Sequence, residues 1–295
     1  MVRTITAPAD KVGALLDGDG RSPEERRQLA RLVALLAGLP PLHDPGGHFP
    51  EVDRLHAGLL SQLTGDDGEA LEESLLELYC HLHMHEAPYT PAERQVVRST
   101  GGYWCHAGGL SPLLRAGPWL GPTTVSADLG AGNGLQGLLL QRLYPHRRTI
   151  LVEISSGMVE RGRALQTWLG VPDDRVEWVL GDVRDFSVVG VDFLYLYRPL
   201  RPEGSGRDFY RRLAAELGRA ASPVVVFSVA DCLGPFLGSR FERFAFDGQL
   251  ACFRGPLPDP VPVAVPGESP PPERGCPPGR GRRTRRLPAR RGGSQ

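Results

Sequence analysis

Three acidic residues follow three successive apolar runs in the middle of the chain: Asp128, Glu153 and Asp182. Each stands at the carboxyl end of a short segment whose apolar and β-branched residues predict a buried strand. Ligands of open α/β sheets lie outside the carboxyl ends of the strands. The three carboxylates are therefore expected to line one site, where an acid of this kind accepts hydrogen bonds from ribose hydroxyls.

A glycine-rich turn joins the first of these strands to a helix. It reads Asp-Leu-Gly-Ala-Gly-Asn-Gly and runs from Asp128 to Gly134. Glycines let the backbone turn tightly and approach a ligand, and the helix that follows offers unpaired N–H groups at its first turn. This unit of strand, glycine loop, helix, strand and acid predicts a site for a cofactor that carries a nucleoside.

Two alignments of the glycines compete. Gly132, Gly134 and Gly137 match the G-x-G-x-x-G pattern of dinucleotide sites, with Glu153 about 20 residues further on. That alignment favours an NAD-dependent oxidoreductase, but it would place Asp128 inside the strand, where an unpaired carboxylate is costly. The other alignment begins the motif at Asp128 and leaves this residue at the end of the strand. We favour the second alignment.

In that alignment the chain resembles the class I S-adenosylmethionine-dependent methyltransferases, whose first motif is D-x-G-x-G-x-G. The resemblance covers about residues 100–255. It implies an α/β fold with a seven-stranded Rossmann-like methyltransferase sheet, parallel with a C-terminal antiparallel hairpin. Asp247-Gly248 between two strand-like runs predicts such a hairpin. A hairpin of this kind resembles the end of the methyltransferase fold and is not the usual end of a dinucleotide domain.

The resemblance also implies a cofactor, S-adenosyl-L-methionine, and a set of residues that hold it. Asp182 takes the position of the carboxylate that binds the exocyclic amine of adenine, and the backbone N–H of Val183 the position that serves the ring. The complete predicted set comprises the first motif, the residues after the second and third strands and one earlier aromatic residue: Tyr103, Asp128, Gly130, Ala131, Gly132, Asn133, Gly134, Glu153, Ile154, Asp182 and Val183.

Candidate catalytic residues come from two segments. Ser99–Leu110 has glycine pairs on both sides of an aromatic–histidine centre, and four glycines exclude a plain helix. In the methyltransferases it resembles, this segment often folds over the methionine end of the cofactor, which makes Tyr103 and His106 contact candidates. A structural turn around a buried Trp104 is the alternative interpretation. His106 is our first choice for a base because histidine titrates near neutral pH.

The second segment is the fourth strand, Val191–Tyr197, which runs into Arg198-Pro199. Methyltransferases that act on planar amino nitrogens often carry Asn/Asp-Pro-Pro-aromatic at this position. The sequence Tyr-Arg-Pro here weakens the case for such a substrate. Tyr197 or Arg198 is a candidate to orient a substrate, although an arginine at a strand end can equally pair with a structural carboxylate.

The chain divides into three predicted regions. Residues 1–99 read as a helical N-terminal region, residues 100–255 as the methyltransferase domain, and residues 256–295 as a Pro- and Arg-rich disordered tail. The basic tail raises the possibility of nucleic-acid binding, but a solvated low-complexity tail is the favoured interpretation. Three histidines at 81, 83 and 85 have the spacing of metal ligands, without a clear partner cluster, and we predict no metal site.

The composition of the chain limits its expected partners and cellular location. The chain has 295 residues, 41% of them hydrophobic, and a formal net charge of +0, so no global field attracts nucleic acid or membrane. Five cysteines without a C-x-x-C pair, no signal peptide and no long apolar run indicate a cytoplasmic protein. We expect a small-molecule methyl acceptor, which the sequence does not identify. The alternative is a binding protein that kept the cofactor fold and lost catalysis.

Overall fold

The computed structural model describes residues 21–84, 89–102 and 108–258. These residues form one compact unit. Tyr103, His106 and the basic tail, which carry three of the sequence-based predictions, lie outside the described residues.

The predicted N-terminal helical region is confirmed. Its helices are α2 (Pro23–Ala37), α3 (Val52–Gln62), α4 (Gly68–Met84) and α5 (Pro91–Thr100). Two of them begin at complete capping boxes with proline in the first turn: Ser22 with Glu25 on α2, and Thr90 with Glu93 on α5. These local signals fix the residues at which α2 and α5 begin.

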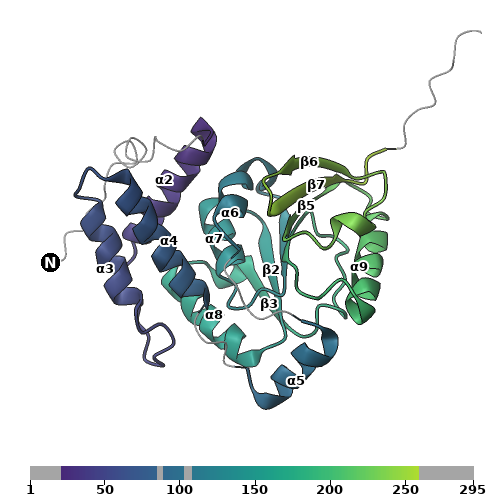
Figure 1. Cartoon of the computed structure of the whole chain (residues 1–295), viewed down its shortest axis with the longest axis horizontal. Coiled ribbons are helices and arrows are strands. Elements are labelled where there is room, and N and C mark those ends of the chain that lie inside the picture. The colour runs from purple at the N-terminus through teal and green to yellow at the C-terminus, as the bar shows by residue number, and fades with distance from the viewer. Residues whose placement is uncertain (1–20, 85–88, 103–107, 259–295) are drawn as a thin grey trace, which may run out of the picture. The chain divides into compact units, whose positions relative to one another are not determined.

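The sheet has seven strands in the order β3-β2-β1-β4-β5-β7-β6 (Figure 1). Strands β1 to β5 pair in parallel, whereas β7 is antiparallel to both β5 and β6. The predicted methyltransferase-type sheet with its C-terminal hairpin is thus confirmed. The strands are β1 (Val125–Leu129), β2 (Arg148–Glu153), β3 (Val176–Leu180), β4 (Phe193–Tyr197), β5 (Val224–Val229), β6 (Glu242–Phe246) and β7 (Leu250–Gly255).

Helices cover both faces of the sheet (Figure 1). One face packs against α7 (Leu135–Leu143) and α8 (Ser156–Trp168), and the core on this side continues into the N-terminal helices. The other face packs against α9 (Gly204–Leu217). Because successive side chains of a strand point to opposite faces, Leu194 and Leu196 belong to the α9 side and Phe193 and Tyr195 to the α7 side.

Four shorter elements complete the described fold: α6 (Ser111–Arg115), η1 (Gly117–Trp119), η2 (Asp173–Arg175) and η3 (Gly234–Phe236). Among the described residues, no helix combines the length and the apolar character needed to cross a membrane.

Candidate cofactor-binding site

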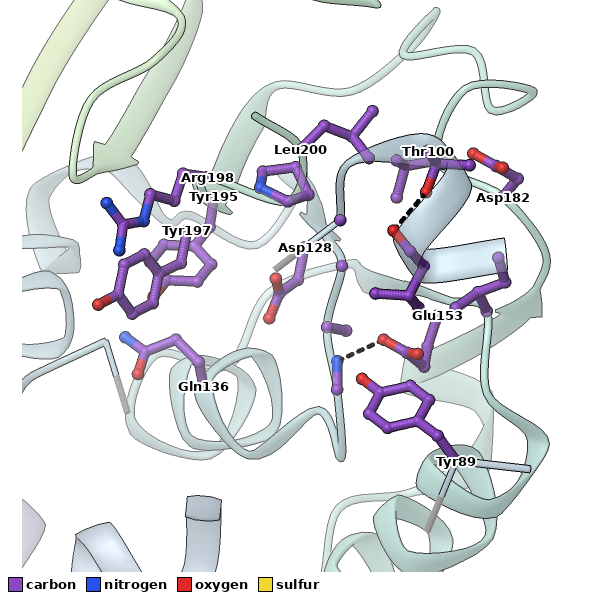
Figure 2. A pocket seen from close by; sticks show the side chains of 18 of the residues that line it. Tyr89, Thr100, Asp128, Gln136, Glu153, Asp182, Tyr195, Tyr197, Arg198 and Leu200 are labelled. Carbon is purple, nitrogen blue, oxygen red and sulfur yellow. Dashed lines mark hydrogen bonds between the residues drawn. The ribbon is translucent and has the colours of Figure 1, made fainter. Parts of the chain in front are cut away.

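A pocket lies at the carboxyl ends of β1 to β4, where the sequence analysis places the ligand (Figure 2). Its empty volume is about 900 Å³, including open solvent at the mouth. Most of the predicted residues that the structure describes line it: Asp128, Gly130, Ala131, Gly132, Glu153, Ile154, Asp182, Val183 and Tyr197.

The order of the strands fixes the order of the groups along the pocket. Asp182 follows β3, Glu153 ends β2, Asp128 belongs to β1, and Tyr197 ends β4. Because these strands are neighbours in the sheet in the order β3-β2-β1-β4, the pocket runs from Asp182 at one end to Tyr197 at the other. A ligand in it would meet the three acids in succession.

The glycine loop is held by β2. The backbone N–H groups of Gly130 and Ala131 both donate to the carbonyl oxygen of Val152, at 3.0 and 2.9 Å. Gly130, Gly132 and Gly134 have φ angles of +77°, +60° and +68°, a region that side chains disfavour. The three glycines are therefore required by the backbone path of the loop itself.

Glu153 joins the loop to the second strand. Its Oε2 accepts from the N–H of Gly132 at 2.9 Å (Figure 2). Its Oε1 accepts from the N–H of Ser155, also at 2.9 Å. Burial raises the pKa of Glu153 to about 7, although these backbone donors oppose the shift. The carboxylate also accepts from the backbone N–H of Ile154, and one of its roughly four lone-pair sites is left to accept from a ligand hydroxyl.

Asp128 is the most unusual group in the pocket. It is the fourth of five residues in β1, so the expectation that it ends the strand was wrong by one residue. Burial, and after it the charge of Glu153, raise the pKa of Asp128 to about 8, against a hydrogen bond from the N–H of Gly137. Its Oδ2 is buried and has no hydrogen-bond partner in the described structure. A buried acceptor of this kind calls for a donor or a cation from a ligand.

Two residues of the glycine motif, Asn133 and Gly134, contact other parts of the fold and do not line the pocket. The side-chain amide of Asn133 donates to the carbonyl oxygen of Leu82 on α4 at 2.6 Å, and its Oδ1 accepts from the N–H of Leu135. A Cβ atom on Gly134 would lie 2.5 Å from the ring of Trp178. Neither Asn133 nor Gly134 is among the pocket-lining residues. The side chain of Asn133 therefore fastens α4 to the loop.

Asp182 already has a cationic neighbour. Its carboxylate accepts from Nε and Nη2 of Arg184, at 2.7 Å for the shortest contact, and from the backbone N–H of Arg184 at 2.8 Å. Although burial alone would raise it, these hydrogen bonds hold the pKa of Asp182 below its usual value. An adenine amine at Asp182 would share this carboxylate with Arg184.

The end of β4 closes the other end of the pocket. Tyr195, Tyr197, Arg198 and Pro199 line it there. Arg198 has a φ of +25°, which is rare for a residue with a side chain and marks strain of the kind found at functional sites. Leu200, two residues after Arg198, pairs with Gly102 in an isolated antiparallel bridge. This pairing brings Gly102, which follows α5, to the pocket.

Part of the pocket wall was not predicted from the sequence. The pocket is also lined by His83, Tyr89 and Gln136. Tyr79 lies outside the pocket lining, and its hydroxyl donates to the side chain of Gln136. His83 belongs to the histidine cluster that was weighed only as a metal site, and Gln136 follows the glycine motif by two residues. Within the described part of the chain, no group of three or more His, Cys, Asp or Glu side chains is placed to hold a metal ion.

Comparisons with known proteins gave matches only among solved structures: no family model and no curated protein matches the chain. One match is an RNA methyltransferase from Salinibacter ruber in complex with S-adenosyl-L-homocysteine (23% identity, 48% of this chain, 84% of that chain, TM-score 0.36). A mutant of MtNAS matches over 86% of this chain and 80% of that chain, with 16% identity and a TM-score of 0.37. A putative methyltransferase from Streptococcus mutans in complex with SAH matches over 47% of this chain and 90% of that chain, with 9% identity and a TM-score of 0.35.

Proposed function

We propose that this protein binds S-adenosyl-L-methionine and transfers its methyl group to a small-molecule acceptor. The observation that carries the proposal is Asp128, a fully buried carboxylate whose Oδ2 has no hydrogen-bond partner in the described structure. S-adenosyl-L-methionine is a cationic ligand, with a sulfonium and an ammonium group. A positive group at Asp128 would satisfy this oxygen and favour its ionised form.

The strand order supports the orientation of this cofactor. Asp182 and Val183 after β3 suit the adenine, and Glu153 and Ile154 after β2 suit the ribose. The glycine loop and Asp128 then meet the amino-acid end. This order follows the order of the parts in the cofactor, whose adenosine and amino-acid ends lie on opposite sides of the sulfonium.

The same contacts disfavour a dinucleotide. A pyrophosphate needs free N–H groups at the start of the helix, but the N–H of Gly132 donates to Glu153, that of Leu135 to Asn133 and that of Gly137 to Asp128. A pyrophosphate would also lie beside two carboxylates, Asp128 and Glu153, where like charges repel. The NAD-dependent alternative therefore has less support.

The acceptor would enter at the β4 end. When bound, the cofactor supplies an activated methyl group, so that an acceptor nucleophile displaces S-adenosylhomocysteine in one step. The residues of the chain supply alignment and exclude water. Tyr197 lines this end of the pocket and is proposed to orient the acceptor. His106 and Tyr103, which precede Gly108 in the chain, stay proposed as the base and as a contact residue.

Calorimetric titration tests the proposal. The full chain is titrated with S-adenosyl-L-methionine and separately with NAD, and Asp128→Asn is titrated alongside. We expect the wild type to bind S-adenosyl-L-methionine and not NAD, and Asp128→Asn to bind it at least tenfold more weakly. Asp66→Asn, an exposed carboxyl outside the pocket, is the matched control. Binding of NAD alone, or of neither ligand, would contradict the proposal.

A further inference from the structure

A buried chain of three side chains reaches the pocket from the N-terminal helical region. Tyr79 and His83 lie one turn apart on α4, with their rings in an edge-to-face contact 4.8 Å between centroids. The hydroxyl of Tyr79 lies 3.1 Å from Nε2 of His83 and 2.6 Å from Oε1 of Gln136 on α7. All three side chains are at least nine-tenths buried.

The contacts of Tyr79 fix the orientation of the Gln136 amide. The hydroxyl has one proton, and the short 2.6 Å contact to Oε1 of Gln136 takes it in preference to the 3.1 Å contact to the carbonyl oxygen of Gly109. Burial lowers the pKa of His83 to about 4. His83 is therefore neutral at physiological pH, and its Nε2–H can donate to the hydroxyl oxygen. The amide oxygen of Gln136 is held by Tyr79, which directs its Nε2 into the pocket.

The Nε2 of Gln136 has no hydrogen-bond partner in the described structure, although the residue is only 2% exposed. Leaving a buried donor unsatisfied costs about 1–3 kcal/mol. Gln136 lines the pocket, and Figure 2 shows its amide on the same side as Tyr197 and Arg198. An acceptor atom of a ligand at this place would satisfy the amide.

The position of Gln136 identifies the kind of ligand group that would accept a hydrogen bond from its amide. Gln136 is in the first turn of α7, directly after the glycine loop, and Asp128 lies across from it in β1. Oδ2 of Asp128 and Nε2 of Gln136 are both buried without a hydrogen-bond partner in the described structure, and they offer a carboxyl acceptor and an amide donor. An α-amino acid group offers their complements, an ammonium for Asp128 and a carboxylate for Gln136.

We propose that Gln136 donates a hydrogen bond to the carboxylate of the amino-acid end of the cofactor, and that Tyr79 and His83 hold its amide in position. The inference rests on the proposed function, because it takes the cofactor to be S-adenosyl-L-methionine. It gives the helical region a part in ligand recognition: Tyr79 and His83 are positioning residues, and Gln136 is the contact residue.

The test uses two probes that differ only in that carboxylate: S-adenosyl-L-methionine and decarboxylated S-adenosylmethionine, which keeps the sulfonium and the amine. Dissociation constants are measured calorimetrically for the wild type, Gln136→Met, Gln136→Leu and Tyr79→Phe. Gln141→Met and Tyr144→Phe are matched controls. Gln141 is a buried glutamine of the same helix bonded to Thr149 and His146, and the hydroxyl of Tyr144 donates to the carbonyl oxygen of Leu113. Neither lines the pocket.

We expect the wild type to prefer the probe with the carboxylate. Gln136→Met and Gln136→Leu should reduce this preference roughly tenfold or more, by weakening the binding of that probe alone, since hydrogen bonds to charged groups are worth about 1.5–3 kcal/mol. Tyr79→Phe should cause a smaller loss in the same direction, because the amide loses the partner that orients it. The two controls should keep the preference of the wild type even where they lower the thermal stability.

An unchanged preference in both Gln136 variants would overturn the inference and leave the proposed function intact. The same holds if the wild type binds both probes equally. If the wild type binds neither probe, the proposed function itself has failed. If Gln136 instead binds a carboxylate of the methyl acceptor, both Gln136 variants should keep the wild-type preference between the two cofactor probes. That outcome also counts against the inference.

Discussion

Asp128 on β1 is in register with Tyr195 on β4, its neighbour in the sheet. Because paired residues of adjacent parallel strands point to the same face, both side chains point to the side covered by α7. Asp128 therefore lies between Leu151 of β2 and Tyr195, away from bulk water. This placement explains the raised pKa of the Asp128 carboxyl. It also supports the proposal that a cationic ligand binds beside it.

The first prediction concerns stability and pH. The pKa of Asp128 is about 8 in the folded protein, against an ordinary value of 3.8 for an aspartate. A raised folded pKa means that the stabilising contribution is complete below about pH 4 and is lost as the pH rises through about 8. The free energy of unfolding should therefore fall between these values, by at most about 1.4 kcal/mol per pH unit for this one group. Glu153, with its pKa raised to about 7, adds to the fall in the same direction.

Urea titrations at pH 5.5, 7 and 8.5 measure this effect. Asp128→Asn removes the titrating carboxyl, so its unfolding free energy should decline less with pH and exceed that of the wild type at pH 8.5 by about 1 kcal/mol or more. Asp66→Asn, at an exposed position, should follow the wild type. Parallel pH curves for Asp128→Asn and the wild type would show that Asp128 does not titrate as described.

The second prediction concerns cofactor binding and pH. A cation beside Asp128 favours the ionised carboxylate, so binding should release a proton from a group whose pKa is about 8 in the free protein. The affinity for S-adenosyl-L-methionine should rise between pH 6 and 8, by up to tenfold per pH unit. Calorimetry in two buffers of different ionisation enthalpy counts the protons released. Asp128→Asn should lose both the proton release and most of the pH dependence.

The third prediction separates the structural residue of the motif from the binding residues. The amide of Asn133 donates to the carbonyl oxygen of Leu82, and both are buried. Asn133→Ala should lower the free energy of unfolding by about 1–3 kcal/mol, because it leaves that carbonyl without a partner. The dissociation constant for S-adenosyl-L-methionine, measured below the unfolding transition, should change less than threefold. A large loss of affinity with unchanged stability would give Asn133 a direct role in binding.

The fourth prediction concerns the adenine end. Asp182 has a half-buried carboxylate that Arg184 holds in place. Asp182→Ala should weaken the binding of S-adenosylhomocysteine by roughly tenfold, the effect of losing a hydrogen bond to a charged group. Arg184→Ala keeps the carboxylate and removes its competitor, so its effect on affinity should be much smaller. Equal losses in both variants would mean that the ion pair, and not the carboxylate, supports binding.

The fifth prediction concerns the reaction. Radiolabelled methyl transfer to a panel of small acceptors should reveal a substrate. With that substrate, His106→Ala and Tyr197→Phe are expected to lower kcat by roughly 10- to 1,000-fold, as losses of proton-transfer or orienting groups do, while calorimetric cofactor affinity stays near that of the wild type. Tyr144→Phe is the control for a buried tyrosine away from the pocket. An unchanged kcat in His106→Ala would remove this residue from the mechanism.

Much of the site could be read from the sequence because its signals are local. The glycines at positive φ, the acids after successive apolar strands and the Asp-Gly hairpin each depend on residues adjacent in the chain. Parallel strands carry their ends to one edge of the sheet, so the pattern alone placed Asp128, Glu153 and Asp182 in one pocket. The caps of α2 and α5 are local in the same sense.

Only the tertiary structure decided which distant side chains meet. Tyr79 and Gln136 are separated by 57 residues, and their contact depends on how α4 packs on α7. The same packing turns Asn133 toward Leu82, although its place in the motif suggests a ligand contact. Local pattern fixes the elements and the ends of the strands, because backbone geometry is set by near neighbours. The partners of a buried polar side chain are set by packing, which no local spacing encodes.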